Sequence, residues 1–168
     1  MDNFWFAKRQ GSEGTSVTQL SEGCLAMDTL VPLLDGRVLS IKEIADEMAT
    51  SEQTIWVYST DPNTGHIAPG LVTWAGVTHK SAKVMRLTFD TGKSVVCTLD
   101  HKFPVLGKGF VEAKDLQLNE SMVPRYTKLN KRGNAAYEMV YQNDEKKWEY
   151  THRMVASFFR KRSEHNEW

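Results

Sequence analysis

The sequence predicts a mainly β protein with one short helix, followed by a small, partial α+β segment. Short β-prone runs recur along most of the chain, and Gly, Asp, Asn and Pro separate them as in turns. In the first three quarters of the chain, one stretch has apolar residues at helical spacing. Near Arg125 the composition of the chain changes and becomes more basic. A chain of 168 residues is long enough to bury a hydrophobic core.

The first 23 residues are polar and rich in Gly, Ser and Thr after the aromatic start Asn3–Phe6. Such a stretch is too short and too interrupted to fold by itself. It lacks the continuous apolar core of a signal peptide, and no run in the chain approaches the ~18 apolar residues of a membrane span. We therefore expect a segment without structure of its own.

An apolar segment then leads from Cys24 to the turn pair Asp35-Gly36, which is typical of a strand entering a hairpin. Ser40 and Glu43 form a capping box, and the apolar residues that follow predict a helix over about 41–49. Beyond it, β-prone runs bounded by turns predict strands at 54–60, 84–90 and 94–98, one strand or a pair of strands over 66–77, and a turn and strand over 104–110.

The last part of the chain differs in charge. Residues 1–124 contain 11 Lys+Arg and 15 Asp+Glu, whereas residues 125–168 contain 10 and 6, so the balances are −4 and +4. The whole chain is neutral, which gives it no overall attraction to nucleic acid or membranes. Residues 128–134 are basic and loop-like, and a hairpin over 137–151 and a helix from His152 follow.

The chain has two cysteines, Cys24 and Cys97, which do not make a disulfide framework. A reducing, cytoplasmic setting suits a protein whose cysteine must stay free.

Two short stretches carry residues suited to cysteine chemistry. Cys24 follows the small residue Gly23, and a Thr98-x-x-His101 pattern lies about seventy residues later. The Cys24 thiol could attack the Gly23 carbonyl, but a free thiol with a pKa near ~8.5 needs help to do so. A thiol beside a small residue and a Thr/His pair are together the parts needed to activate a peptide bond for attack by a cysteine. A buried structural cysteine and a structural histidine are the alternatives.

These stretches resemble the splicing motifs of inteins over about residues 24–124. The first matches Cys-Leu-x-x-Asp-Thr-x-Val, followed by Asp-Gly and Ile-x-Glu-Ile, with Met27 where glycine is usual. The second matches Thr-x-x-His, with Gly109-Phe110 and Ala113–Leu116 after it. The resemblance implies an N-extein tail in residues 1–23 and a horseshoe-shaped Hint domain in residues 24–124 whose C-terminal strands are missing. It also implies Cys24, Thr98 and His101 as catalytic residues, a scissile Gly23–Cys24 bond, and no metal or cofactor. In this reading His101 gives a proton to the nitrogen of the scissile bond, and Thr98 polarises or holds the same peptide.

Residues 128–160 are similar to the leading segment of phage-type HNH homing endonucleases, which contains a hairpin and then Tyr-x-His-Arg-x-Val-Ala-x-x-Phe, here from Tyr150 to Phe159. The paired histidines of the metal-binding core do not follow. We therefore expect residues 125–168 to be a partial HNH-like segment that cuts no DNA, with weak DNA binding through residues 125–162.

The intein resemblance implies single-turnover, autocatalytic cleavage through a thioester. The missing C-terminal intein half, in cis or as a split partner, and the flanking exteins would be the partners. His165-Asn166 resembles the end of an intein, but Glu167 cannot act as the next nucleophile, so we interpret this pair as coincidental. A hedgehog-type Hint autoprocessing domain and a DNA-binding or homing endonuclease accessory fragment remain as alternatives.

Overall fold

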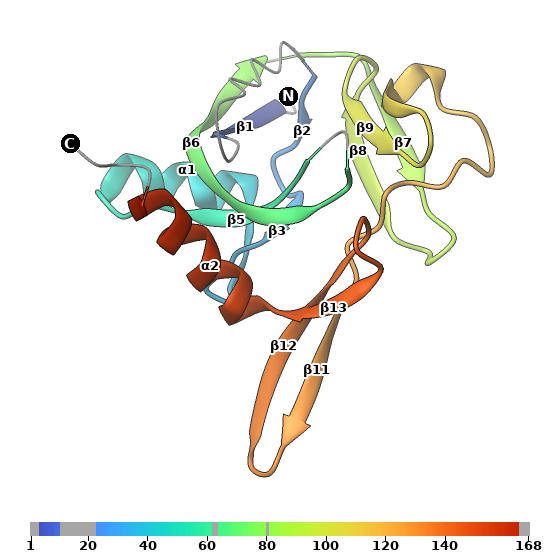
Figure 1. The fold of residues 1–168 in the computed structure, drawn as a ribbon. Coiled ribbons are helices and arrows are strands. Elements are labelled where there is room, and N and C mark those ends of the chain that lie inside the picture. Colours follow the sequence, from blue (N-terminus) through green and yellow to red (C-terminus); the bar gives the residue numbers. More distant parts are fainter. Residues whose placement is uncertain (1–3, 11–22, 62–63, 80, 165–168) are drawn as a thin grey trace.

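The protein is mainly β in a computed structural model, which describes residues 4–10, 23–61, 64–79 and 81–164 (Figure 1). The largest sheet has six antiparallel strands in the order β5-β6-β1-β2-β8-β7. In chain order these are β1 (Phe4–Gln10), β2 (Leu25–Ala26), β5 (Trp56–Thr60), β6 (Ile67–His79), β7 (Val84–Thr88) and β8 (Ser94–Thr98). The expected fold class is therefore confirmed, and the region expected at 66–77 is one long strand, which curves across the molecule (Figure 1).

Strand β1 corrects one expectation. Residues 4–10 do not lack structure, because they pair with β6 from Phe4↔His79 to Gln10↔Leu71 and with β2 at two further positions. Both neighbours are distant in the sequence. An aromatic run has high β propensity, yet only such long-range pairing provides its backbone with partners.

The predicted hairpin and helix are both present. Strands β3 (Leu30–Pro32) and β4 (Val38–Ser40) pair around the Asp35-Gly36 turn, and helix α1 (Ile41–Thr50) begins directly afterwards. Ser40 Oγ accepts a hydrogen bond from the Glu43 amide at 3.2 Å, and the Glu43 carboxylate accepts one from the Ser40 amide at 2.7 Å. This is the capping box that the sequence predicts.

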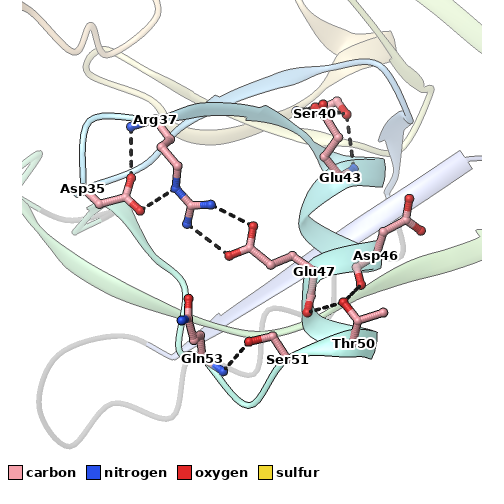
Figure 2. Close-up of polar contacts among 9 residues, drawn as sticks. All are labelled: Asp35, Arg37, Ser40, Glu43, Asp46, Glu47, Thr50, Ser51 and Gln53. Atoms are coloured by element: carbon pink, nitrogen blue, oxygen red, sulfur yellow. Dashed lines mark hydrogen bonds and ion pairs between the residues drawn. The ribbon is translucent and has the colours of Figure 1, made fainter.

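A second set of contacts attaches the hairpin turn to α1 (Figure 2). Arg37 donates to Asp35 at 2.7 Å and makes a forked pair with Glu47 at 2.8 and 3.1 Å. Solvent screens these charges, so the pairs contribute little to stability. They connect the residues of the turn to Glu47 in the last part of α1.

The buried face of α1 packs on the sheet. A core cluster joins Leu33, Ile44, Ile55, Val57 and Val72. On the other side of the domain, β9 (Lys102–Val105) and β10 (Gly109–Glu112) form the hairpin expected around residues 104–110, followed by the short 3-10 helix η1 (Ala113–Asp115).

The C-terminal segment forms a three-stranded sheet and a helix. Its elements are β11 (Thr127–Arg132), β12 (Ala135–Gln142), β13 (Lys147–Tyr150) and α2 (Thr151–Glu164). The expected β12–β13 hairpin and helix are confirmed. The basic stretch expected as a loop is instead strand β11, because residues 127–132 pair fully with β12 across a turn at Gly133, whose φ is +60°. Figure 1 shows this β11–β12 hairpin extending away from the rest of the chain.

The C-terminal segment shares a core with the β domain. Ile67 of β6, Val140 of β12 and Met154 of α2 are buried together. The buried Gln142 side chain accepts a hydrogen bond from the Ile67 amide at 2.8 Å and donates one to the Ile67 carbonyl at 2.9 Å. In the part of the chain that the structure describes, no helix is both long and apolar enough to cross a membrane.

Candidate active site

The structure brings Cys24 and Thr98 into direct contact. Cys24 lies immediately before β2 and is fully buried, and Thr98 ends β8, the strand that pairs with β2 at Leu25↔Cys97. The Cys24 amide donates a hydrogen bond to Thr98 Oγ1 at 2.8 Å, and the Cys24 carbonyl accepts one from the Thr98 amide at 2.9 Å. The nitrogen of the Gly23–Cys24 peptide bond therefore faces the Thr98 hydroxyl.

His101 packs directly against Gly23, the residue before Cys24. A Cβ atom added at Gly23 would be 2.3 Å from His101 Cα and 2.6 Å from its backbone nitrogen, so only glycine fits in this position. The His101 backbone is held on both sides, since its amide donates to the Thr98 carbonyl at 3.2 Å and its carbonyl accepts from the Ala113 amide at 2.8 Å. Pairing of β8 and the turn after it thus place both motif residues at the Gly23–Cys24 bond.

Burial controls the charge of His101. Desolvation lowers the pKa of the imidazole, while hydrogen bonding to the Gly23 main chain and the nearby Asp100 carboxylate oppose this shift. The ring is therefore neutral at pH 7. Its Nδ1 atom is buried and has no hydrogen-bond partner among the described residues. A buried, neutral imidazole with an unused nitrogen is suited to giving or taking a proton.

The Cys24 thiol has a partner that the sequence did not indicate. Its Sγ atom is 2.7 Å from Thr78 Oγ1, near the end of β6. Burial raises the pKa of the thiol, the hydrogen bond with Thr78 lowers it, and the Asp100 charge raises it. Thr78 was missed because a threonine in a β-branched run is the ordinary composition of a strand.

The second cysteine has a different environment. Cys97 is fully buried within β8, and burial raises the pKa of its thiol to about 11. It therefore stays protonated at neutral pH and acts as a small core residue.

Several residues outside the site of Cys24, Thr98 and His101 have structural contacts. The carbonyls of Met27 and Thr29 accept hydrogen bonds from the first amides of α1, at 3.1 Å each. His66 pairs with Asp144 at 2.9 Å, although the sequence indicates no role for it, and the His152 ring packs beside Tyr150. His165 and Asn166 lie outside the described residues. Within those residues, no group of three or more His, Cys, Asp or Glu side chains is arranged to hold a metal ion.

Comparison with known proteins finds similar segments in three proteins of DNA and RNA metabolism. The chain is 33% identical over 142 residues to a DNA gyrase subunit of Synechocystis sp., an alignment that spans 82% of this chain and 13% of that protein. It is 34% identical over 110 residues to the replicative DNA helicase DnaB of Rhodothermus marinus, spanning 65% of this chain and 11% of that protein. It is 26% identical over 107 residues to the DNA-directed RNA polymerase III subunit rpc2 of Dictyostelium discoideum, spanning 64% and 6%. No family model matches the chain.

The chain thus spans only a small part of each of these proteins. Residues 1–124 make up less than three quarters of the chain, so the alignment with the gyrase protein, which spans 82% of it, also includes part of the C-terminal segment.

Proposed function

We propose that this chain is the N-terminal part of a self-splicing intein, in which Cys24 cleaves the Gly23–Cys24 peptide bond by an N-to-S acyl shift. The observation that carries the proposal is the arrangement around this bond. Thr98 Oγ1 lies 2.8 Å from the Cys24 nitrogen, and His101 lies directly against Gly23. A nucleophile, a polarising hydroxyl and a proton-transfer group around one amide are the parts that acyl transfer requires.

The reaction is an isomerisation. The Cys24 sulfur forms a bond to the Gly23 carbonyl carbon, the bond from that carbon to the Cys24 nitrogen breaks, and the thiol proton is replaced by a new N–H on the resulting amine. Thr98 orients the amide nitrogen, while the neutral His101 takes up the proton that the thiol loses and gives a proton to the leaving nitrogen, so that it ends the step neutral again. The product is a thioester that joins residues 1–23 to Cys24.

The comparisons support an inserted element. A gyrase component, a helicase and a polymerase component differ in activity, yet each contains a similar stretch of 107–142 aligned residues that makes up a small part of its length. A segment shared by such different proteins is expected of an insertion with its own function, and the resemblance to inteins provides one. These are also the kinds of proteins that carry inteins.

The proposed organisation follows the sequence motifs. Residues 1–23 are the end of the N-extein, residues 24–124 are the splicing domain without its C-terminal strands, and residues 125–168 are a partial HNH endonuclease-like segment. Splicing would require the C-terminal intein half, in cis or as a split partner, and both exteins. No metal or organic cofactor takes part in the proposed cleavage.

The test is nucleophile-induced cleavage. The chain, alone and with a C-terminal intein half, is incubated with dithiothreitol or hydroxylamine, and release of residues 1–23 is followed by denaturing mass spectrometry. Cys24→Ala should abolish release, and Cys97→Ala should retain it. Equal release from the Cys24→Ala variant would refute the assignment.

The activating groups are tested with the same assay. General acid assistance is worth ~10²–10⁴-fold, so His101→Ala should slow release by a factor in that range, and Thr98→Ala should slow it less. Wild-type release from a folded His101→Ala variant would make the histidine structural.

A further inference from the structure

Two threonine hydroxyls hold Cys24, and they contact different atoms. Thr98 Oγ1 is 2.8 Å from the Cys24 backbone nitrogen, whereas Thr78 Oγ1 is 2.7 Å from Sγ. The first contact belongs to the motif that the sequence predicts. The second comes from β6, which is 54 residues away in the sequence and has no part in either motif.

We propose that Thr78 is a positioning residue for the nucleophile: its hydroxyl fixes the orientation of Cys24 Sγ and stabilises the thiolate as it forms. This inference deepens the proposed function and rests on it. The effect on the thiol itself can be measured without any cleavage.

The geometry of the acyl shift makes the side-chain rotamer important. The attacking sulfur and the Gly23 carbonyl carbon are joined through Cys24 Cβ, Cα and N, so the attack closes a five-membered ring. Hydrogen bonds to Thr98 fix the Cys24 backbone on both its amide and its carbonyl. The torsion about Cα–Cβ is then the remaining freedom of the nucleophile, and it has three staggered positions. The hydrogen bond between Thr78 Oγ1 and Sγ selects one of them.

The backbone of β6 is irregular at Thr78. The pairing of β6 with β1 passes from Val77↔Trp5 to His79↔Phe4, so Thr78 is left out of the register as in a β-bulge. Bulges redirect a side chain and are frequent beside active sites. Thr78 is also β-branched, and its own rotamer is therefore restricted. A stiff side chain on a bulge holds the hydroxyl at a defined position.

The negative charge that forms on Sγ is a second reason to assign Thr78 a role. Burial and the Asp100 carboxylate both oppose the thiolate by raising the pKa of Cys24, and the hydrogen bond with Thr78 acts in the other direction. Hydrogen bonds to charged groups are about twice as strong as those between neutral groups. The contribution of Thr78 should accordingly grow as the proton leaves Sγ.

The experiment compares three variants of the full chain. Thr78→Val retains the branched shape and removes the hydroxyl, and Thr78→Ser retains the hydroxyl. Thr73→Val is the matched control, because Thr73 is also left out of the β6–β1 register but lies roughly 16 Å away along the strand. Hydroxylamine-induced release of residues 1–23 is measured from pH 6 to 10, and the Cys24 thiol is titrated by NMR with ¹³Cβ-labelled cysteine.

Thr78→Val should slow release about tenfold at pH 7, shift the pH–rate profile to higher pH and raise the titration midpoint of the Cys24 signal. Thr78→Ser and Thr73→Val should both remain near the wild type. Wild-type titration and rate in folded Thr78→Val, or equal slowing in Thr73→Val, would overturn the role of Thr78. If the wild-type chain releases nothing but Thr78→Val still shifts the titration of Cys24, the proposed cleavage is refuted. The contact between Thr78 and the Cys24 thiol would still stand in that case.

Discussion

The substitution Gly23→Ala, which adds one methyl group, should have separate, measurable effects on the stability of the protein and on the rate of cleavage. In Gly23→Ala the new Cβ would lie 2.3 Å from His101 Cα, whereas carbon atoms in contact are normally about 3.5–4.0 Å apart. The His101 backbone cannot move freely, because its hydrogen bonds to Thr98 and Ala113 hold it on both sides. Gly23 and the peptide bond after it must therefore shift by more than about 1 Å.

The loss of stability and the loss of cleavage rate can be estimated separately. Overpacking a well-filled site destabilises a protein by about 1–3 kcal/mol, and each kcal/mol lowers Tm by about 2–4 °C in a chain of this size. A displacement of about 1 Å at reacting groups can reduce the rate about a hundredfold. Gly23→Ala should thus lower Tm by several degrees and slow hydroxylamine-induced release about a hundredfold.

A second glycine provides the control. At Gly70 an added Cβ would be 2.8 Å from the Ser59 Cβ, in the β5–β6 pair and outside the active site. Gly70→Ala should show a comparable fall in Tm by calorimetry, with release near the wild-type rate once the protein is folded. Release at the wild-type rate from Gly23→Ala would refute the inference that His101 and the scissile bond are in close contact.

Three further predictions concern acid stability, the shared core and the C-terminal segment. Because burial lowers the pKa of His101 below its ordinary value of about 6.5, the unfolded chain binds a proton that the folded chain excludes, so stability should fall as the pH drops below about 6.5. Urea midpoints from pH 7.5 to 5 check this, and His101→Gln should show a smaller loss. Gln142→Leu should cost about 2–5 kcal/mol in urea unfolding, because it leaves the Ile67 amide and carbonyl without their partner, and an unchanged midpoint would contradict this. The chain should not nick plasmid DNA with magnesium or manganese, and its weak DNA binding should fade with salt and weaken further in Arg153→Ala; metal-dependent nicking would show a complete nuclease site.

The parts of the fold that were predictable depend on short-range signals. Ser40 and Glu43 are three residues apart, so their capping box can be seen in the sequence and fixes the start of α1. Thr98 and His101 are likewise only three residues apart, so this pair can be recognised in the sequence. Cys24 could be matched with them only through the resemblance, because about seventy residues separate it from Thr98.

The missed features depend on pairing between distant strands. Nothing near residues 4–10 indicates that β6 and β2 lie on either side of them, and the basic composition of β11 obscures the partner that β12 provides. Thr78 is a further case. Its hydroxyl meets Cys24 because the register of β6 changes at this residue, and a change of register leaves no mark in composition or periodicity.

The position of β1 has a consequence for how the proposed reaction ends. This strand lies between β6 and β2, and its backbone pairs with both of them. Breaking the covalent bond after Gly23 removes none of those hydrogen bonds, so the severed N-terminal piece would leave only when its strand dissociates from the sheet. Cutting and departure are then two events with separate rates, and the cleaved chain would migrate as an intact particle under native conditions while appearing as two polypeptides in denaturant.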